Sequence, residues 1–185
     1  MTKIQRFASC ISVALLLSIA QGQGQTHRSQ AGTETSVNRN GNSSLETKIN
    51  ATAVRIVIAT YQIDIGKPGE PPEERKNNCT YSSFPCSQVS NLQIWVKGTN
   101  LFVPKSVFAD CTDVGNMRLT KEAGGYVLTI SGGDASEAYS VKVFFTADRV
   151  TRREVYDGES NSLLESTTYK PSPEFARLIW PTSLI

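Results

Sequence analysis

The chain between residues 51 and 170 alternates short β-branched and aromatic stretches with turns rich in Gly, Asp, Asn and Pro. In the clearest stretch, Val141, Val143 and Phe145 share one face and polar residues lie between them. Such alternation is typical of half-buried strands. We therefore expect strands over residues 53–65, 92–97, 101–103, 126–130, 139–146, 150–156 and 163–169.

Short strands at regular spacing, with turns between them, predict an all-β fold. We expect an antiparallel meander that forms a sandwich or a small barrel, as one domain over residues 51–170. At most one short helical turn is expected, near residues 106–110, with Ser106 as its N-cap. Pro171 and Pro173 end the predicted sheet, because proline cannot donate to a strand ladder.

Residues 1–20 have the pattern of a secretory signal peptide. Lys3 and Arg6 form a basic start, an apolar run covers residues 11–20, and small residues precede a polar segment. The pattern predicts an exported protein, periplasmic or extracellular. No later segment is long and apolar enough to cross a bilayer, so we expect no transmembrane segment in the mature chain.

Two flanking segments differ from the β domain in composition. Residues 21–50 are rich in Gln, Ser, Thr, Asn and Gly, with Val37 and Leu45 as the main large apolar residues, which predicts a disordered tether. Residues 171–185 carry several apolar side chains and are expected to pack on the domain as a tail. The sequons at Asn42, Asn50 and Asn78 are glycan acceptors in a eukaryotic secretory pathway and chance matches in most bacteria.

Three cysteines remain once Cys10 leaves with the signal peptide. We favour a disulfide between Cys79 and Cys86, because these residues flank a loop rich in Ser and Pro. A bridge between Cys86 and Cys111 is the alternative, and either choice leaves one further thiol. A metal-binding thiol set is disfavoured, because the spacing matches no zinc motif.

Charge and histidine content exclude several function classes. The chain has 19 Lys and Arg against 17 Asp and Glu, and removing Lys3 and Arg6 makes the numbers equal. A neutral chain gives no electrostatic reason to expect nucleic acid as a partner. The single histidine, His27, lies in the predicted tether, which argues against histidine-dependent catalysis and histidine-ligated metals in the β domain. We expect no catalytic residue, no cofactor and no metal site.

Acidic side chains leave one metal hypothesis open. A calcium site would use Asp110, Asp113, Asp134 and Glu137, since hard cations prefer clustered oxygens. Their spacing matches no calcium loop, so we favour their interpretation as turn residues.

Three further features suggest interaction surfaces. Tyr81 and Phe84 lie in the Cys79–Cys86 loop and form a possible interaction loop, and Trp95 is a possible exposed aromatic side chain. The neighbours Arg152 and Arg153 place one guanidinium on each face of a strand. We expect one to face inward with a carboxylate partner, for which Glu154 and Glu165 are the candidates.

Three segments of the chain resemble exported bacterial β-rich proteins of uncharacterised function: residues 101–110, 125–137 and 149–156. The resemblance covers about residues 92–169. It implies a β fold and a bacterial source, and it implies no activity and no functional residues.

Together these features predict an exported, non-enzymatic β domain that acts as a binding or interaction module for a protein or glycan outside the cytoplasm. Two alternatives are a secreted inhibitor or structural envelope protein, and a hydrolase that uses carboxylates alone.

Overall fold

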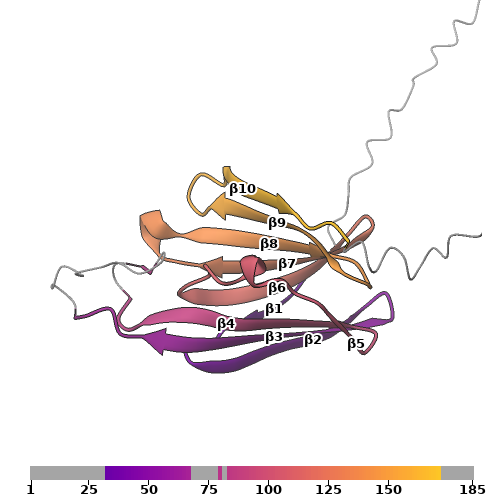
Figure 1. Cartoon of the computed structure of the whole chain (residues 1–185), viewed down its shortest axis with the longest axis horizontal. Helices are drawn as coiled ribbons and strands as arrows, with labels where there is room; N and C mark the ends of the chain where they lie inside the picture. The colour runs from indigo at the N-terminus through magenta and orange to yellow at the C-terminus, as the bar shows by residue number, and fades with distance from the viewer. Residues whose placement is uncertain (1–31, 68–78, 81–82, 172–185) are drawn as a thin grey trace, which may run out of the picture.

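The computed structural model describes residues 32–67, 79–80 and 83–171 and contains two antiparallel sheets. The six-stranded sheet has the order β1 (Thr33–Ser36), β6 (Val114–Glu122), β7 (Gly125–Gly132), β8 (Tyr139–Phe145), β9 (Val150–Asp157) and β10 (Leu163–Thr168). The four-stranded sheet has the order β2 (Gly41–Ile49), β3 (Thr52–Ile63), β4 (Cys86–Val96) and β5 (Thr99–Leu101) (Figure 1).

The predicted all-β fold is confirmed, and the arrangement is a sandwich, since neither sheet closes into a barrel over the described residues. Both sheets contain a meander, β2 to β5 in one and β6 to β10 in the other. Inward side chains from the two sheets form one core, including Ile56, Ile58, Ile94, Leu128 and Val141, none of which is exposed. No helix in the described part of the chain is long and apolar enough to cross a membrane.

The prediction of a disordered tether over residues 21–50 is wrong from residue 33 onward. Strand β1 pairs with β6, and β2 pairs with β3 along its whole length, from Gly41 opposite Thr60 to Ile49 opposite Thr52. Backbone hydrogen bonds hold a strand whatever its side chains, and an edge strand needs few apolar residues. Val37 and Leu45, the main large apolar residues of this segment, are both buried in the core, and Ile49 packs against it.

The helical prediction needs two corrections. The turn near residues 106–110 is present as η1 (Lys105–Val107), but it follows Pro104, and Ser106 is not its N-cap. A second turn, η2 (Ala135–Glu137), lies in the connection that we predicted as a plain turn. Strand β6 was not predicted at all, although Met117 and Leu119 face the core.

The two sheets differ in strand number, and this difference leaves part of one sheet uncovered. Inward residues of β8 are fully buried, whereas β10 is exposed along almost its whole length. Figure 1 shows β10 at the margin of the molecule, away from the four-stranded sheet. The segment from β5 to β6 carries η1, and its Val107 and Phe108 are buried in the core.

The Asp113 carboxylate joins three distant segments at one end of the sandwich. Its Oδ2 accepts from the backbone N–H of Thr80 (3.0 Å), and its Oδ1 accepts from the N–H of Ser87 (3.0 Å) and from Nη2 of Arg39 (3.2 Å). Thr80 and Ser87 are next to Cys79 and Cys86, which form the predicted disulfide. Asp113 has a positive φ of 45°, a conformation that Asp and Asn tolerate better than most residues.

Some predictions fall on undescribed residues. The signal peptide of residues 1–20, Asn78 and Tyr81 lie outside the described residues, as does the tail beyond Pro171. Asn42 lies exposed on β2, and Asn50 lies exposed in the turn that follows it.

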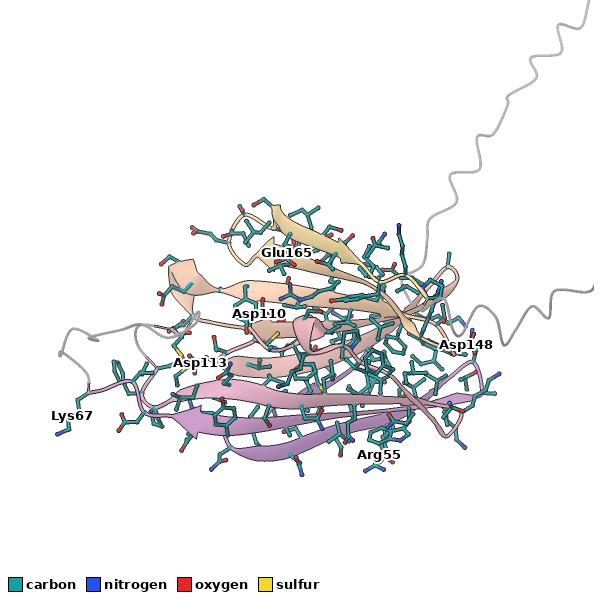
Figure 2. All side chains as sticks on the ribbon, viewed as in Figure 1. Arg55, Lys67, Asp110, Asp113, Asp148 and Glu165 are labelled. Carbon is teal, nitrogen blue, oxygen red and sulfur yellow. A yellow bond between two sulfur atoms is a disulfide. The ribbon has the colours of Figure 1, made fainter. Side chains whose placement is uncertain are left out.

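Asp113→Asn should lower the free energy of unfolding by about 1–3 kcal/mol, because one of the two backbone N–H groups then faces an amide donor. Asparagine keeps the shape and tolerates the positive φ, so the change isolates the loss of the carboxylate. Urea denaturation measures the effect. Asp148→Asn, at an exposed turn at the opposite end of the molecule (Figure 2), is the matched control. Equal stability of the two variants would contradict this role.

Candidate functional site

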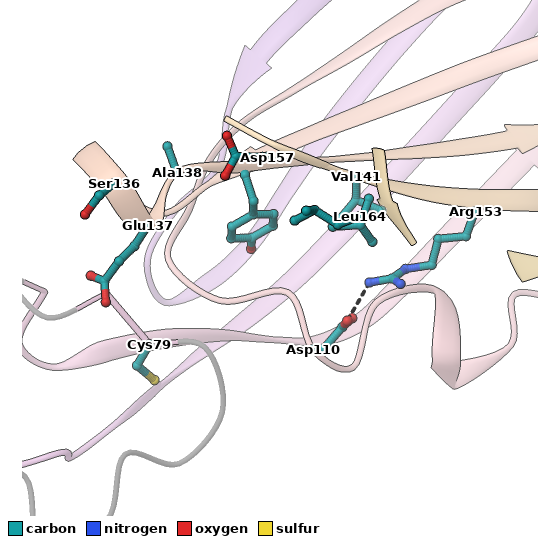
Figure 3. A pocket seen from close by; sticks show the side chains of 11 residues that line it. Cys79, Asp110, Ser136, Glu137, Ala138, Val141, Arg153, Asp157 and Leu164 are labelled. Carbon is teal, nitrogen blue, oxygen red and sulfur yellow. Dashed lines mark hydrogen bonds and ion pairs between the residues drawn. The ribbon is translucent and has the colours of Figure 1, made fainter. Parts of the chain in front are cut away.

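A cleft of about 460 Å³ lies on the part of the six-stranded sheet that the four-stranded sheet leaves uncovered (Figure 3). Strands β8, β9 and β10 supply one wall, and η2, the segment after η1 and the disulfide supply the remainder. Its lining residues are Cys79, Asp110, Ser136, Glu137, Ala138, Tyr139, Val141, Arg153, Val155, Asp157 and Leu164.

Apolar side chains form part of the wall. Val141, Val155 and Leu164 come from three neighbouring strands and lie along the same cleft. Leu164 keeps 63 % of its surface exposed. The exposed surface of Leu164 is not covered by the rest of the described chain, so it can contact a ligand.

Arg153 has a buried side chain, with the residue 2 % exposed, and each nitrogen of its guanidinium donates a hydrogen bond. Nε donates to the carbonyl oxygen of Val107 (3.2 Å), Nη1 donates to Oε1 of Glu165 (2.9 Å), and Nη2 donates to Oδ2 of Asp110 (2.5 Å). Burial lowers the pKa of Arg153, but the nearby carboxylates outweigh it and the pKa is raised. Arg153 therefore remains a cation inside the fold.

The expectation for the arginine pair is confirmed in part. Arg153 is the inward member, and Glu165 is one of its partners. Glu154 pairs instead with Arg152 on the outer face, at 3.0 Å. Asp110, the second partner of Arg153, was not predicted.

The cleft is acidic overall. Asp110, Glu137 and Asp157 line it together with one cation, Arg153. Hydrogen bonds from the backbone N–H and the hydroxyl of Ser160 lower the pKa of the Asp157 carboxyl, so Asp157 is ionised at neutral pH. The Oδ1 atom of Asp110 is buried and has no hydrogen-bond partner.

Tyr139 lines the cleft and also hydrogen-bonds to Thr112, in the segment between η1 and β6. Its hydroxyl donates to the carbonyl oxygen of Thr112 (2.6 Å) and accepts from the N–H of the same residue (2.8 Å). Burial raises the pKa of this phenol above its ordinary value. Tyr139 therefore stays neutral and has a structural role, fixing the chain beside Cys111.

Cys111 is a buried free thiol, which excludes the alternative bridge to Cys86. Burial is the main cause that raises the pKa of Cys111, to about 12, and the Asp110 charge adds to it. Such a thiol is a poor nucleophile and a poor metal ligand.

The four acidic residues of the calcium hypothesis have separate roles. Asp110 pairs with Arg153, and Asp113 accepts backbone N–H groups. Asp134 lies exposed directly before η2, and Glu137 lines the cleft. Within the described ranges, no group of three or more His, Cys, Asp and Glu residues is arranged to hold a metal ion.

The predicted aromatic sites lie elsewhere. Trp95 is half-buried on the outer face of β4, with the Arg55 guanidinium 5.0 Å from its ring centroid. Both line a shallow groove on the four-stranded sheet. Figure 2 shows Arg55 on the side of the molecule away from Asp110 and Glu165. Phe84 is partly buried, and its companion in the predicted interaction loop, Tyr81, is not described.

Sequence reasoning missed most of the cleft, because its residues come from segments far apart in the chain. The signal that pointed toward it was the Arg152-Arg153 pair. No family model, curated protein or solved structure matches this chain.

Removing both carboxylates from Arg153 should cost far more than the sum of the single changes. Asp110→Asn and Glu165→Gln each leave one counter-charge and should each lower the free energy of unfolding by about 1 kcal/mol. The double variant leaves a buried guanidinium without a counter-charge, with a loss of about 3–5 kcal/mol. Urea denaturation measures all three. Glu46→Gln, which removes the exposed ion pair with Arg55, is the control. Additive losses would contradict the shared role.

The Cys111 thiol should resist labelling in the folded chain. With a pKa of about 12, only about one thiol in 10,000 is ionised at pH 8. In a Cys10→Ser background, a colorimetric disulfide reagent should react with Cys111 only after urea unfolds the protein. Rapid labelling of the folded chain would show that the thiol is accessible.

The same pKa difference makes stability depend on pH. The unfolded thiol ionises near pH 9, and the folded thiol does not, so the free energy of unfolding should fall as pH rises from about 9 to about 12. Cys111→Ala lacks this contribution and is the control. Parallel pH profiles of the two proteins would contradict the assignment.

Proposed function

We propose that this chain is an exported, non-enzymatic binding module whose cleft takes a cationic group on an aliphatic stem, such as a lysine side chain of a partner protein. The observation that carries the proposal is the composition of the cleft, in which three carboxylates and an apolar wall surround an arginine that is already neutralised. The Cys79–Cys86 disulfide supports an oxidising location outside the cytoplasm.

The chemistry of the cleft favours a cation over an anion. The three guanidinium nitrogens of Arg153, Nε, Nη1 and Nη2, already donate to protein oxygens. An anionic ligand would therefore have to displace Asp110 or Glu165. A cation, in contrast, meets the carboxylates of Asp157 and Glu137, which line the cleft. An alkyl stem fits against the apolar wall, as long cationic side chains do on protein surfaces.

The hydrolase alternative has less support from the same residues. Hydrolysis by two carboxylates needs one acid whose pKa is raised so that it carries a proton. Asp157 has a lowered pKa, and Asp110 is held by the Arg153 guanidinium. The lowered pKa keeps Asp157 ionised at neutral pH, which suits cation binding.

The inhibitor alternative depends on the loop between Cys79 and Cys86. Its described aromatic residue, Phe84, is partly buried and so offers less contact area than a protruding loop tip needs. We therefore place the interaction in the cleft.

n-Butylamine, which is the lysine side chain without its backbone, tests the proposal. We expect it to shift the methyl NMR signals of Val141, Val155 and Leu164, and we expect n-butanol to have no such effect at equal concentration. Methyl NMR is the appropriate measurement because so small a ligand binds weakly.

Glu137→Gln should weaken n-butylamine binding about threefold to tenfold, because it removes one of the charges at the rim. Glu159→Gln, an exposed residue outside the lining of the cleft, is the matched control. Equal shifts with the amine and the alcohol, or equal affinities for the two variants, would refute the cationic site.

A further inference from the structure

The outer face of the four-stranded sheet carries one transverse row of polar and aromatic side chains. Glu46 of β2 lies opposite Arg55 of β3, which lies opposite Trp95 of β4, and Asn100 of β5 completes the row. Residues that lie opposite each other in neighbouring strands point to the same face of a sheet. The row therefore lies on the face away from the core, and it borders the shallow groove that Trp95 and Arg55 line.

Small residues leave this groove open beside the Trp95 ring. Its volume is about 540 Å³, and Ala53 and Gly98 are among its lining residues. Gly98 lies in the turn between β4 and β5 with a positive φ of 82°. Apart from its chain neighbours, no heavy atom lies within 4 Å of the place where a Cβ of Gly98 would be. A ligand can therefore approach the indole ring from the side of this turn.

Charged groups at the groove have hydrogen-bonding capacity that the fold does not use. Nε of Arg55 donates to Oε1 of Glu46 (2.9 Å), and both side chains are more than half exposed. Lys48 also lines the groove and forms no ion pair with any residue that the structure describes. The lining thus holds two cations and one carboxylate, which favours an anionic group.

We propose that this groove binds a sugar residue that carries a carboxylate, a hexuronate. The apolar C–H face of the pyranose ring packs against the Trp95 indole. Neighbouring hydroxyl groups of the sugar bind Arg55 and Glu46, because the guanidinium donates hydrogen bonds and the carboxylate accepts them. The carboxylate of the sugar pairs with the Lys48 ammonium group, two residues along β2 from Glu46 and on the same face.

Each part of this ligand matches a property of the groove. A neutral sugar would leave the Lys48 charge without a partner, and a carboxylate on a peptide side chain would leave the Trp95 ring uncovered. Nucleic acid needs several cations for its phosphates, whereas the lining has two, one of which Glu46 neutralises. The aromatic ring and the charge balance together therefore favour an acidic sugar.

The groove is separate from the cleft on the six-stranded sheet. No residue lines both, and Arg55 lies on the side of the molecule away from Asp110 and Glu165 (Figure 2). The two sites also favour ligands of opposite charge. This inference therefore does not depend on the ligand that we assign to the cleft.

Tryptophan fluorescence of the full chain tests the proposal. The sequence has two tryptophans, Trp95 and Trp180, so a Trp180→Phe background reports on Trp95 alone. We expect methyl β-D-glucuronide to change this fluorescence saturably. Methyl β-D-glucoside, which lacks the carboxylate, should bind about threefold to tenfold more weakly. So small a ligand binds weakly, and the titrations therefore extend to high concentration at constant ionic strength.

Lys48→Gln should lower the affinity for the glucuronide to that for the glucoside, because it removes the partner of the carboxylate. Lys48 is exposed on an edge strand, so the variant should fold. Lys67→Gln is the matched control, since Lys67 is exposed and lies far from Arg55 (Figure 2).

Four outcomes would overturn the proposal. They are an unchanged fluorescence of the Trp180→Phe chain, equal affinities for the two sugars, equal affinities of the two glutamine variants, and acetate binding as tight as that of the glucuronide. The last outcome would mean that the sugar ring contributes nothing.

Saturation-transfer NMR of the bound sugar tests the ring contact separately. Trp95→Ala should remove most of the saturation transfer to the C–H protons of the glucuronide. Tyr61→Ala, which removes an exposed aromatic ring of β3 outside the lining of the groove, is the matched control and should leave the transfer unchanged. Equal transfer in the two variants would contradict stacking on Trp95.

Discussion

The difference in strand number between the two sheets is the constraint on which the rest of this structure depends. Four strands cannot cover the inner face of six, so Val141, Val143 and Phe145 of β8 are buried, whereas β10 is exposed along almost its whole length. The segment around η1 covers part of the remaining face, and the cleft occupies the part next to it. The cleft and the buried arginine are therefore results of one mismatch.

Where the apolar core ends, charged side chains hold neighbouring segments together. Arg153 lies where the core thins toward β10, and it binds one carboxylate on the strand beside it and another on the segment that crosses over it. Asp113 has the same function at the disulfide end, where it holds backbone groups of two segments. Buried charged groups of this kind contribute more to the choice of which chain segments contact each other than to the total stability of the fold.

The sequence was most informative where each strand carried its own alternation. Strands β7 to β10 follow from their side-chain pattern and their turns, and the Cys79–Cys86 bridge follows from the loop that it closes. Strands β1 and β2 escaped prediction because hydrogen bonds to β6 and β3 hold them, and Val37, Leu45 and Ile49 are the few large apolar residues of this segment. The cleft escaped because Asp110 and Arg153 meet only through the long-range packing of η1 over β9.

The placement of β1 and β2 has a consequence for folding. Strand β2 pairs with β3 across a short turn, with Ile49 opposite Thr52. Strand β1 pairs with the distant β6, with Thr33 opposite Leu119. Contacts between residues so distant in sequence form slowly, because a long loop must close first. Strand β1, the first strand of the described chain, is thus among the last to join its sheet. During synthesis on the ribosome, β1 therefore stays unpaired until β6 has emerged, and the six-stranded sheet is completed only afterwards.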